Sequence, residues 1–312
     1  MRSCLIGLLL SSCVVTLGCS GSETGGAGGG GGGGDANPND LTFHTGQFTA
    51  PPGESFTCFY LDAKSPRELS VTGGSGEQGP GGHHILVYYT DETRPAQHHP
   101  CVDAEMINWH QIAGSAGQSS TGAEGVVTLP PGLAIKVPEG KQFVIQSHYI
   151  NTSGKAETVD DSVTIRTTEP SGVKAYVNYF ANSYEGFEVP PNGSLKAKTL
   201  CTVPQDFNVV LTLGHMHEFG THFTMQTADD TGKPIEMLYD KSWQPLYTSH
   251  PPITYYSYEK PMELKKGTKI LQTCEWQNTT PDPITFPREM CVGFFYYYPD
   301  AGEILCDTQP LP

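Results

Sequence analysis

The residues of this chain whose types and spacing point most directly to chemistry are its histidines. Two of them, His83 and His84, are adjacent at the start of the apolar run HHILVYY. Side chains alternate between the faces of a strand, so adjacent histidines normally point in opposite directions. Both can reach one ligand only where a bulge or a strand end intervenes. The pair indicates either chance, in a chain with 11 histidines, or a metal that takes further ligands from elsewhere.

A third histidine, His148, lies in the run KQFVIQSHYI, where Val144 and Gln146 share its face if the run is a strand. A lone histidine on such a face is more often a satisfied core residue than a ligand. Because the adjacent pair lies in the same half of the chain, the three imidazoles are enough for one metal site.

The second half of the chain carries a His-x-His pair, His215 and His217, in LTLGHMHEFGTHF. A strand places both on one face, which is a common way to chelate a metal. Met290 begins the apolar run MCVGFFYYYP and, on composition alone, is a packing residue. Two imidazoles and a thioether would form a soft ligand set suited to copper, particularly Cu(I).

Zinc is the alternative metal, because three histidines and a water molecule form a hydrolytic zinc site. Such an enzyme needs a carboxylate base, and Glu218 is the obvious candidate. It falls on the opposite strand face from its histidine neighbours, which argues against this alternative.

The elements that must position these residues are strands. Apolar runs at 83–89, 141–150, 207–217 and 290–299 are separated by Gly- and Pro-rich turns, and no segment has a sustained 3.6-residue period. The sequence therefore predicts an all-β protein built of sandwiches. The stretch Glu-Pro-Ser-Gly at 169–172 predicts a boundary between domains at 41–170 and 171–312.

The N-terminus reads as an export signal. Residues 1–19 carry Arg2, an apolar stretch and a small-residue exit ending in Cys19. This pattern is typical of a bacterial lipoprotein, with Cys19 lipidated. Residues 20–40 are rich in glycine and predict a flexible tether. We expect an extracytoplasmic protein anchored by lipid to a bacterial membrane, the outer membrane by analogy with bacterial sorting.

Six of the nine cysteines remain after the signal and the lipidated residue, which predicts three disulfides in an exported protein. Their spacing alone does not choose among the possible pairings. The formal net charge is −15 and no basic patch is visible, so nucleic acid is not an expected partner. We expect a small-molecule substrate instead, with contact to the membrane only through the anchor.

Taken together, these motifs resemble the copper type II, ascorbate-dependent monooxygenases, the family of peptidylglycine α-hydroxylating monooxygenase and dopamine β-monooxygenase. That family uses a His-His pair and a distant histidine for one copper, and His-x-His with the methionine of Glu-Met-Cys for the other. The likeness covers Leu41 to Thr308. The matching residues, in the same order, are His83, His84, His148, His215, His217 and Met290.

The resemblance implies two tandem jelly-roll-like sandwiches, each with one copper, on the two sides of an interdomain cleft. It also implies two copper ions, O2, and ascorbate or another one-electron donor. The copper held by His215, His217 and Met290 would bind O2, and a substrate C–H bond would become hydroxylated. The disulfides implied by the resemblance are Cys58–Cys101, Cys201–Cys306 and Cys274–Cys291.

This chain departs from the peptide-processing branch where that branch holds a substrate carboxylate. The matching residues are Leu213, Val292 and Phe294, which share a strand face with the ligands and carry no polar group. A buried carboxylate without a partner is costly, so we expect an apolar or aromatic substrate pocket rather than a peptidylglycine site. The alternative to an enzyme is a surface copper-binding or storage protein, which would use the same ligands without turnover.

Overall fold

Strands account for nearly all the regular structure of this chain, which we describe from a computed structural model. The structure describes residues 39–116, 128–248, 250–286 and 288–311. The predicted signal, Cys19 and the tether up to residue 38 lie outside these ranges. Within them there is no α-helix, only the 3-10 turns η1 (Asp103–Asn108), η2 (Pro170–Gly172) and η3 (Pro245–Thr248). None of the described helical turns is long and apolar enough to span a membrane.

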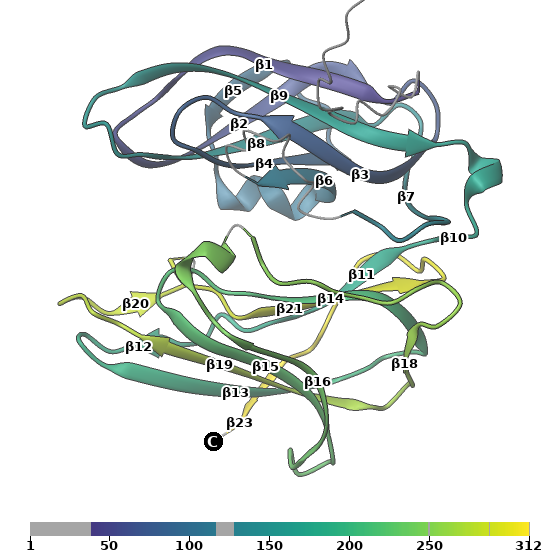
Figure 1. Ribbon diagram of the computed structural model, residues 1–312, viewed down its shortest axis with the longest axis vertical. Helices are drawn as coiled ribbons and strands as arrows, with labels where there is room; N and C mark the ends of the chain where they lie inside the picture. The colour runs from purple at the N-terminus through teal and green to yellow at the C-terminus, as the bar shows by residue number, and fades with distance from the viewer. Residues whose placement is uncertain (1–38, 117–127, 249, 287, 312) are drawn as a thin grey trace, which may run out of the picture. The chain divides into compact units, whose positions relative to one another are not determined.

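The first half of the chain forms two five-stranded sheets (Figure 1). One sheet has the order β1-β9-β3-β7-β10, with bounds β1 Leu41–Ala50, β9 Glu157–Thr168, β3 Leu69–Glu77, β7 Leu133–Val137 and β10 Ala175–Tyr176. The other has the order β5-β2-β8-β4-β6, with bounds β5 Gln97–Pro100, β2 Gly53–Lys64, β8 Gln142–Asn151, β4 Gly82–Thr90 and β6 Trp109–Ala116.

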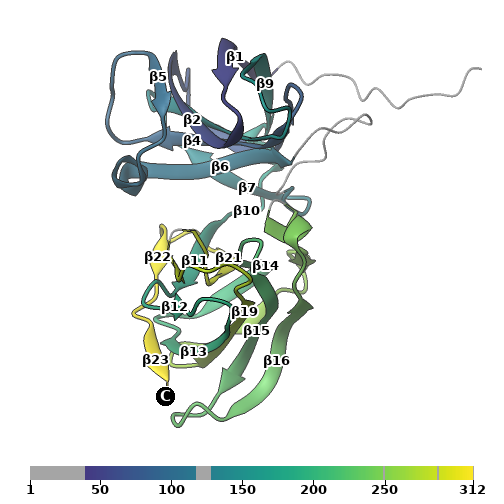
Figure 2. The ribbon, with the colours of Figure 1, turned by 90° about the vertical axis from the view of Figure 1, so that its left-hand side faces the viewer.

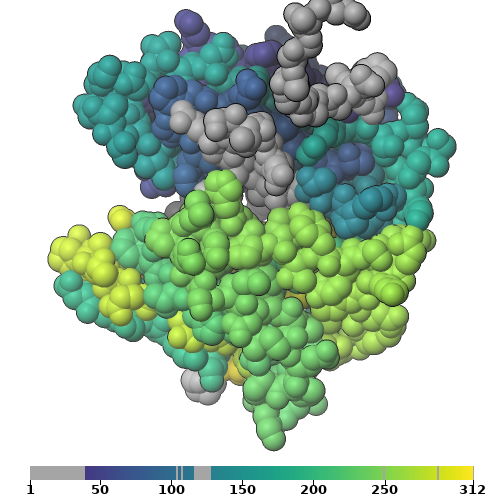
Figure 3. Space-filling model, in the orientation of Figure 1, coloured from purple at the N-terminus to yellow at the C-terminus, as the bar shows by residue number. Residues whose placement is uncertain are grey.

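The second half repeats this two-layer plan, as Figure 2 shows. One layer has the order β17-β14-β21-β11-β22, with β18 also paired to β14: β17 Thr254–Tyr255, β14 Phe207–His215, β21 Val292–Tyr298, β11 Asn178–Ser183, β22 Ile304–Leu305 and β18 Met262–Leu264. The other has the order β16-β15-β19-β13-β23: β16 Pro234–Ser242, β15 Gly220–Ala228, β19 Lys269–Gln277, β13 Ser194–Thr202 and β23 Gln309–Leu311. The short strands β12 (Glu188–Val189) and β20 (Ile284–Thr285) pair separately, and the β15–β16 hairpin projects from the sandwich (Figure 3).

Each sandwich is closed by side chains that its two sheets contribute from facing sides. In the first, Phe48 and Val163 of one sheet pack with Ile85 and Ile145 of the other. In the second, a corresponding cluster contains residues of β14 and β21 together with residues of β15 and β19. The prediction of an all-β sandwich protein is confirmed.

The sheets change over slightly later than the predicted boundary at residue 170. Ala175 and Tyr176 form β10, which pairs in parallel with Leu133 and Ala134 of β7 and therefore belongs to a sheet of the first half. Sheet membership thus divides the chain near Val177.

The part of the chain that the structure describes contains three disulfides, Cys58–Cys101, Cys201–Cys306 and Cys274–Cys291. They are the pairs that the family resemblance implied. Cys274 lies on β19 and Cys291 directly precedes β21, so this bond joins the two layers of the second sandwich. Disulfides are typical of proteins in oxidising, extracytoplasmic environments.

Candidate metal centres

The adjacent histidines converge because β4 is irregular where they lie. His84 pairs with His148 of β8, while the register shifts between Gly82 and His84, leaving His83 as the extra residue. A bulge of this kind turns one side chain toward its neighbour's face, as the sequence required if both imidazoles were to meet. Ile145 faces the sandwich core, and His148, three residues later on the same strand, points to the opposite face. The three histidines therefore lie on the outer face of this sheet.

Three ring nitrogens of this set point at one another. His83 Nδ1 lies 3.0 Å from His148 Nδ1, and His84 Nδ1 lies 3.3 Å from the same atom. All three candidate ligand atoms fall within 4.8 Å of one another. Metal–imidazole bonds of about 2.0–2.1 Å place neighbouring ligand nitrogens about 3 Å apart around one ion. The three imidazoles are therefore placed so that they can converge on a single metal ion.

The outer edge of His148 is held by two residues of β2. The Nε2 of His148 lies 3.0 Å from a carboxylate oxygen of Glu54, and the ring of Phe56 stacks on the imidazole at a centroid distance of 3.9 Å. A carboxylate accepts a hydrogen bond from Nε2–H, which leaves the Nδ1 lone pair free for a metal. Glu54 thus fixes the tautomer that the site needs, and this hydrogen bond lowers the pKa of its own carboxyl.

In the second set, His215 is the last residue of β14, and the predicted strand through His217 is wrong. The chain leaves the sheet at Met216, which is fully buried in the core. The imidazoles still meet, with their Nε2 atoms 3.2 Å apart. His217 Nδ1 lies 2.9 Å from the backbone oxygen of Arg288. Because that oxygen can only accept, the Nε2 of His217 carries the free lone pair.

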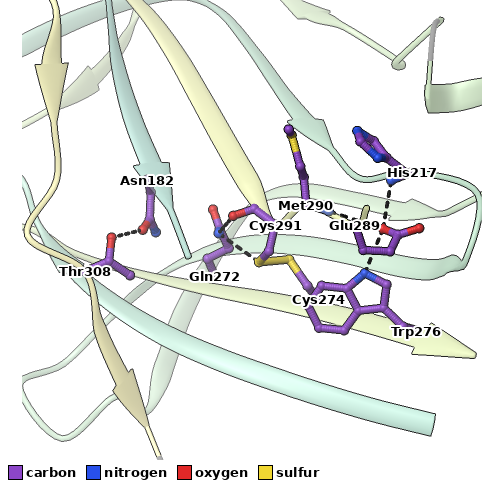
Figure 4. The surroundings of a disulfide bond; sticks show 9 residues. All are labelled: Asn182, His217, Gln272, Cys274, Trp276, Glu289, Met290, Cys291 and Thr308. Atoms are coloured by element: carbon purple, nitrogen blue, oxygen red, sulfur yellow. Dashed lines mark hydrogen bonds between the residues drawn. A yellow bond between two sulfur atoms is a disulfide. The ribbon is translucent and has the colours of Figure 1, made fainter. Parts of the chain in front are cut away.

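Met290 also lies outside a strand, since β21 begins at Val292 rather than at the methionine. Figure 4 shows its thioether and the imidazole of His217 extending to the same side. The two imidazoles and the thioether therefore come from the same end of this sheet, where His215 pairs with Val292.

Burial disfavours the charged form of three of these imidazoles. It is the main cause that lowers the pKa of His83 to about 4 and that of His215 to about 3, and it depresses the pKa of His84 well below its usual value. Electrostatic repulsion from His148 is the next cause that lowers the pKa values of His83 and His84. Neutral imidazoles bind metals without first losing a proton.

The three substrate-pocket candidates share the outer face of their sheet with His215. His215 pairs with Val292 and Leu213 pairs with Phe294 across β14 and β21. Leu213 and Val292 are buried and Phe294 is half-buried. Leu213 and Phe294 pack in an apolar cluster with Tyr296. Their surroundings are apolar, and their role toward a substrate stays a prediction.

One comparison with known families concerns the second sandwich. Residues 177–310 match the family model described as copper type II ascorbate-dependent monooxygenase, C-terminal domain. The second half of the chain is therefore similar to the C-terminal domain of this family. This copper monooxygenase family is a class of oxidoreductases that depends on copper and ascorbate, and the matched segment holds His215, His217 and Met290.

Other comparisons are more distant. Among solved structures, the chain is similar to PNGase F, a glycosylasparaginase from Flavobacterium meningosepticum, at 11% identity and a TM-score of 0.41, over 87% of this chain and 99% of that chain. A comparison with curated protein sequences gives no match.

Two acidic residues beside the candidate ligands and one buried in the first sandwich were not predicted from the sequence. Glu54 faces His148, Asp161 is buried beside β8, and Glu289 is buried beside Met290. A carboxylate directly before the ligand methionine was the available signal for Glu289. The other two are brought into place by strand pairings that join distant parts of the chain, for which the sequence carried no signal.

Proposed function

We propose that this chain is a dicopper monooxygenase that hydroxylates a C–H bond of an apolar or aromatic small molecule, using O2 and a one-electron donor such as ascorbate. The observation that carries the proposal is the convergence of three Nδ1 atoms from His83, His84 and His148. This site lies in a chain whose other half matches the family. The two ligand sets differ, which favours distinct roles over storage of one metal.

The residues divide the work as follows in this proposal. One copper is held by the three histidines of β4 and β8, and the other by His215, His217 and Met290. Copper supplies one-electron redox chemistry and the activation of O2 at the second site. Histidine and thioether ligands suit Cu(I), the state that must meet O2.

The surroundings of the second ligand set select the substrate. Leu213, Val292 and Phe294 offer apolar contacts beside His215 and no partner for a carboxylate. Burying an unpaired carboxylate there is costly, so we expect no turnover of glycine-extended peptides. Robust turnover of such peptides would overturn this part of the proposal.

The location of the enzyme is part of the same proposal. We infer that Cys19 carries a lipid that anchors the protein to a bacterial outer membrane, with residues 20–40 as the tether. Metabolic labelling with a fatty acid tests this, because Cys19→Ser should abolish the label.

The first test is the copper-to-protein ratio of the full chain after copper loading and dialysis. We expect two coppers in the parent, one in His148→Ala, and loss of Cu(I) from the second site in Met290→Ala. His222→Ala is the matched control, because His222 lies on β15 and contacts Asp240; it should keep two coppers. One copper or none in the parent would contradict the dicopper site.

The second test separates an enzyme from a storage protein. The copper-loaded chain is given ascorbate, O2 and a panel of apolar and aromatic small molecules. An enzyme couples O2 consumption to a hydroxylated product, whereas a storage protein yields no product with any member of the panel.

A further inference from the structure

A fully buried carboxylate lies beside the second ligand set. Glu289 directly precedes Met290 and has no exposed surface. The backbone N–H groups of His217 and Phe219 donate to its two oxygens over 2.9 and 2.7 Å, and the indole Nε1–H of Trp276 donates over 3.0 Å (Figure 4). These partners come from the β14–β15 loop and from β19, so one side chain joins both to the segment that carries the methionine.

The chemistry of these contacts requires a carboxylate. Burying a charge is costly unless hydrogen bonds compensate for the lost water, and bonds from N–H groups to a carboxylate are among the stronger ones in proteins. The backbone N–H of Met290 donates to Glu289 as well, over 3.4 Å, so all four partners of this side chain are donors. A glutamine of the same shape would point its amide N–H2 group at one of these donors. Neither that donor nor the amide N–H2 group would then have an acceptor.

Glu289 acts where the sheet no longer fixes the ligands. His217 lies beyond the end of β14, and Met290 lies before the start of β21. Two further hydrogen bonds hold the loop that contains His217. The indole Nε1–H of Trp243 donates to the backbone oxygen of His217 over 3.0 Å, and the backbone N–H of Gln277 donates to the backbone oxygen of Phe219 over 2.9 Å. The hydrogen bonds to Glu289 are the contacts that tie this loop to the segment of Met290.

We propose that Glu289 is a positioning residue that holds the Met290 thioether in place relative to His217 and thereby sets the preference of the second site for Cu(I). The inference rests on the proposed copper site. The buried carboxylate keeps the soft ligand within reach of the metal, and the two histidines alone retain the oxidised ion.

The test uses the full chain loaded anaerobically with Cu(I). Cu(I) affinity is measured by competition with a chelator, and copper–sulfur scattering by X-ray absorption. We expect Glu289→Gln to lose the sulfur signal and to lower Cu(I) affinity at the second site by about 10- to 100-fold, the usual effect of removing a residue that orients metal ligands. Cu(II) binding should change much less.

A double-mutant cycle separates positioning from general damage. If Glu289 acts through the thioether, Glu289→Gln should lower Cu(I) affinity no further in a Met290→Ala background. Asp161→Asn is the matched control, because Asp161 is equally buried but lies in the first sandwich. It should leave the sulfur signal intact.

Two further measurements keep the inference decidable. In the metal-free chain, amide hydrogen exchange at His217 and Phe219 should be faster in Glu289→Gln. Should that variant not fold, Glu289→Asp keeps the charge but withdraws it by one methylene, and it should show a partial loss of Cu(I) affinity. An unchanged sulfur signal and a Cu(I) affinity within twofold of the parent, in whichever variant folds, would overturn the inference. A parent without copper at the second site would instead overturn the proposed function.

Discussion

The imidazole of His110 and the carboxylate of Glu303 meet although they are 193 residues apart, with Nδ1 2.7 Å from Oε1. The other ring nitrogen lies 3.0 Å from a carboxylate oxygen of Asp91, and the ring of Tyr89 stacks on the imidazole. Two acceptors favour the doubly protonated imidazolium. The hydrogen bond to Glu303 is the largest cause that raises the pKa of His110 above its ordinary value of 6.5. This contact joins β6 of the first sandwich to the segment before β22 of the second.

The first prediction concerns the pH dependence of this contact. A raised folded pKa means that its stabilisation is complete below pH 6.5, the ordinary value, and is lost as the pH rises through the folded value. We expect the free energy of unfolding of the parent to fall by about 1 kcal/mol over this pH range. The value is modest because a charged hydrogen bond is partly screened by solvent. In His110→Gln this loss should be absent from urea unfolding curves taken between about pH 6 and 9. His44→Gln, on an exposed position of β1, should keep the parent profile; a parent-like profile in His110→Gln would contradict the assignment.

The second prediction concerns Asp161, which is fully buried and accepts hydrogen bonds from Ser147 and Tyr149. Burial is the main cause that raises its pKa above the ordinary 3.8. Its contribution is therefore complete below that pH and declines as the pH rises through the folded value. The stability advantage of the parent over Asp161→Asn, measured by thermal unfolding, should shrink as the pH rises from about 4 toward 7.

Asp229 provides a control of opposite sign for this experiment. Its pKa is lowered, mainly by the hydrogen bond from the Thr231 side chain. Stabilisation from this group is present above pH 3.8, its ordinary value, and is lost as the pH falls through the folded value. The advantage of the parent over Asp229→Asn should therefore grow with pH. If both variants showed the same trend, the cause assigned to Asp161 would be wrong.

How far the sequence determines this fold can be judged from the second ligand set. The alternation in LTLGHMH correctly places Leu213 and His215 on one face, which the pairs with Phe294 and Val292 establish. The same alternation continues to His217, so periodicity could not show that the strand ends at His215. It ends because Met216 turns into the core, which depends on side chains of the facing sheet.

The irregularities that place the ligands are of the same kind. The sequence showed that His83 and His84 could meet only if a bulge or a strand end lay there. It gave no such reason to expect the register shift between Val209 and Leu211 in β14. Buried contacts between distant segments were also invisible, including those of Glu289 and the bond between His110 and Glu303. Local pattern determined the strands and their faces, while long-range packing determined where they end and what lies beside the ligands.

The third prediction concerns Gly214 and Gly293, which pair across β14 and β21 beside His215 and Val292. A Cβ on Gly214 would lie 2.4 Å from the ring of Phe223, and one on Gly293 would lie 2.4 Å from the sulfur of Met225. Overpacking of this kind costs about 1–3 kcal/mol. Each alanine variant should lower the free energy of unfolding in urea by that amount.

Gly186→Ala is the matched control for these variants. Gly186 is exposed, and an added Cβ would approach only the ring of Tyr184, no closer than 3.2 Å. Its unfolding free energy should change by less than about 0.5 kcal/mol. Core variants as stable as this control would show that the two layers can separate to admit a methyl group.

The last prediction compares two disulfides of the second sandwich. Cys201–Cys306 spans 105 residues and Cys274–Cys291 spans 17. In the chain-entropy view, the longer loop constrains the unfolded chain more, so replacing both cysteines with alanine should cost about 5 kcal/mol for the first pair and about 3 kcal/mol for the second.

Copper binding should show the opposite order. Cys291 directly follows Met290, and its bond fixes that segment to β19, so Cys274→Ala/Cys291→Ala should lower Cu(I) affinity at the second site. Cys201→Ala/Cys306→Ala should leave it unchanged while the protein is folded. Thermal unfolding measures the stability order and chelator competition on the same samples measures the Cu(I) affinities. A parent-like Cu(I) affinity in Cys274→Ala/Cys291→Ala would show that Glu289 alone is enough to hold the thioether.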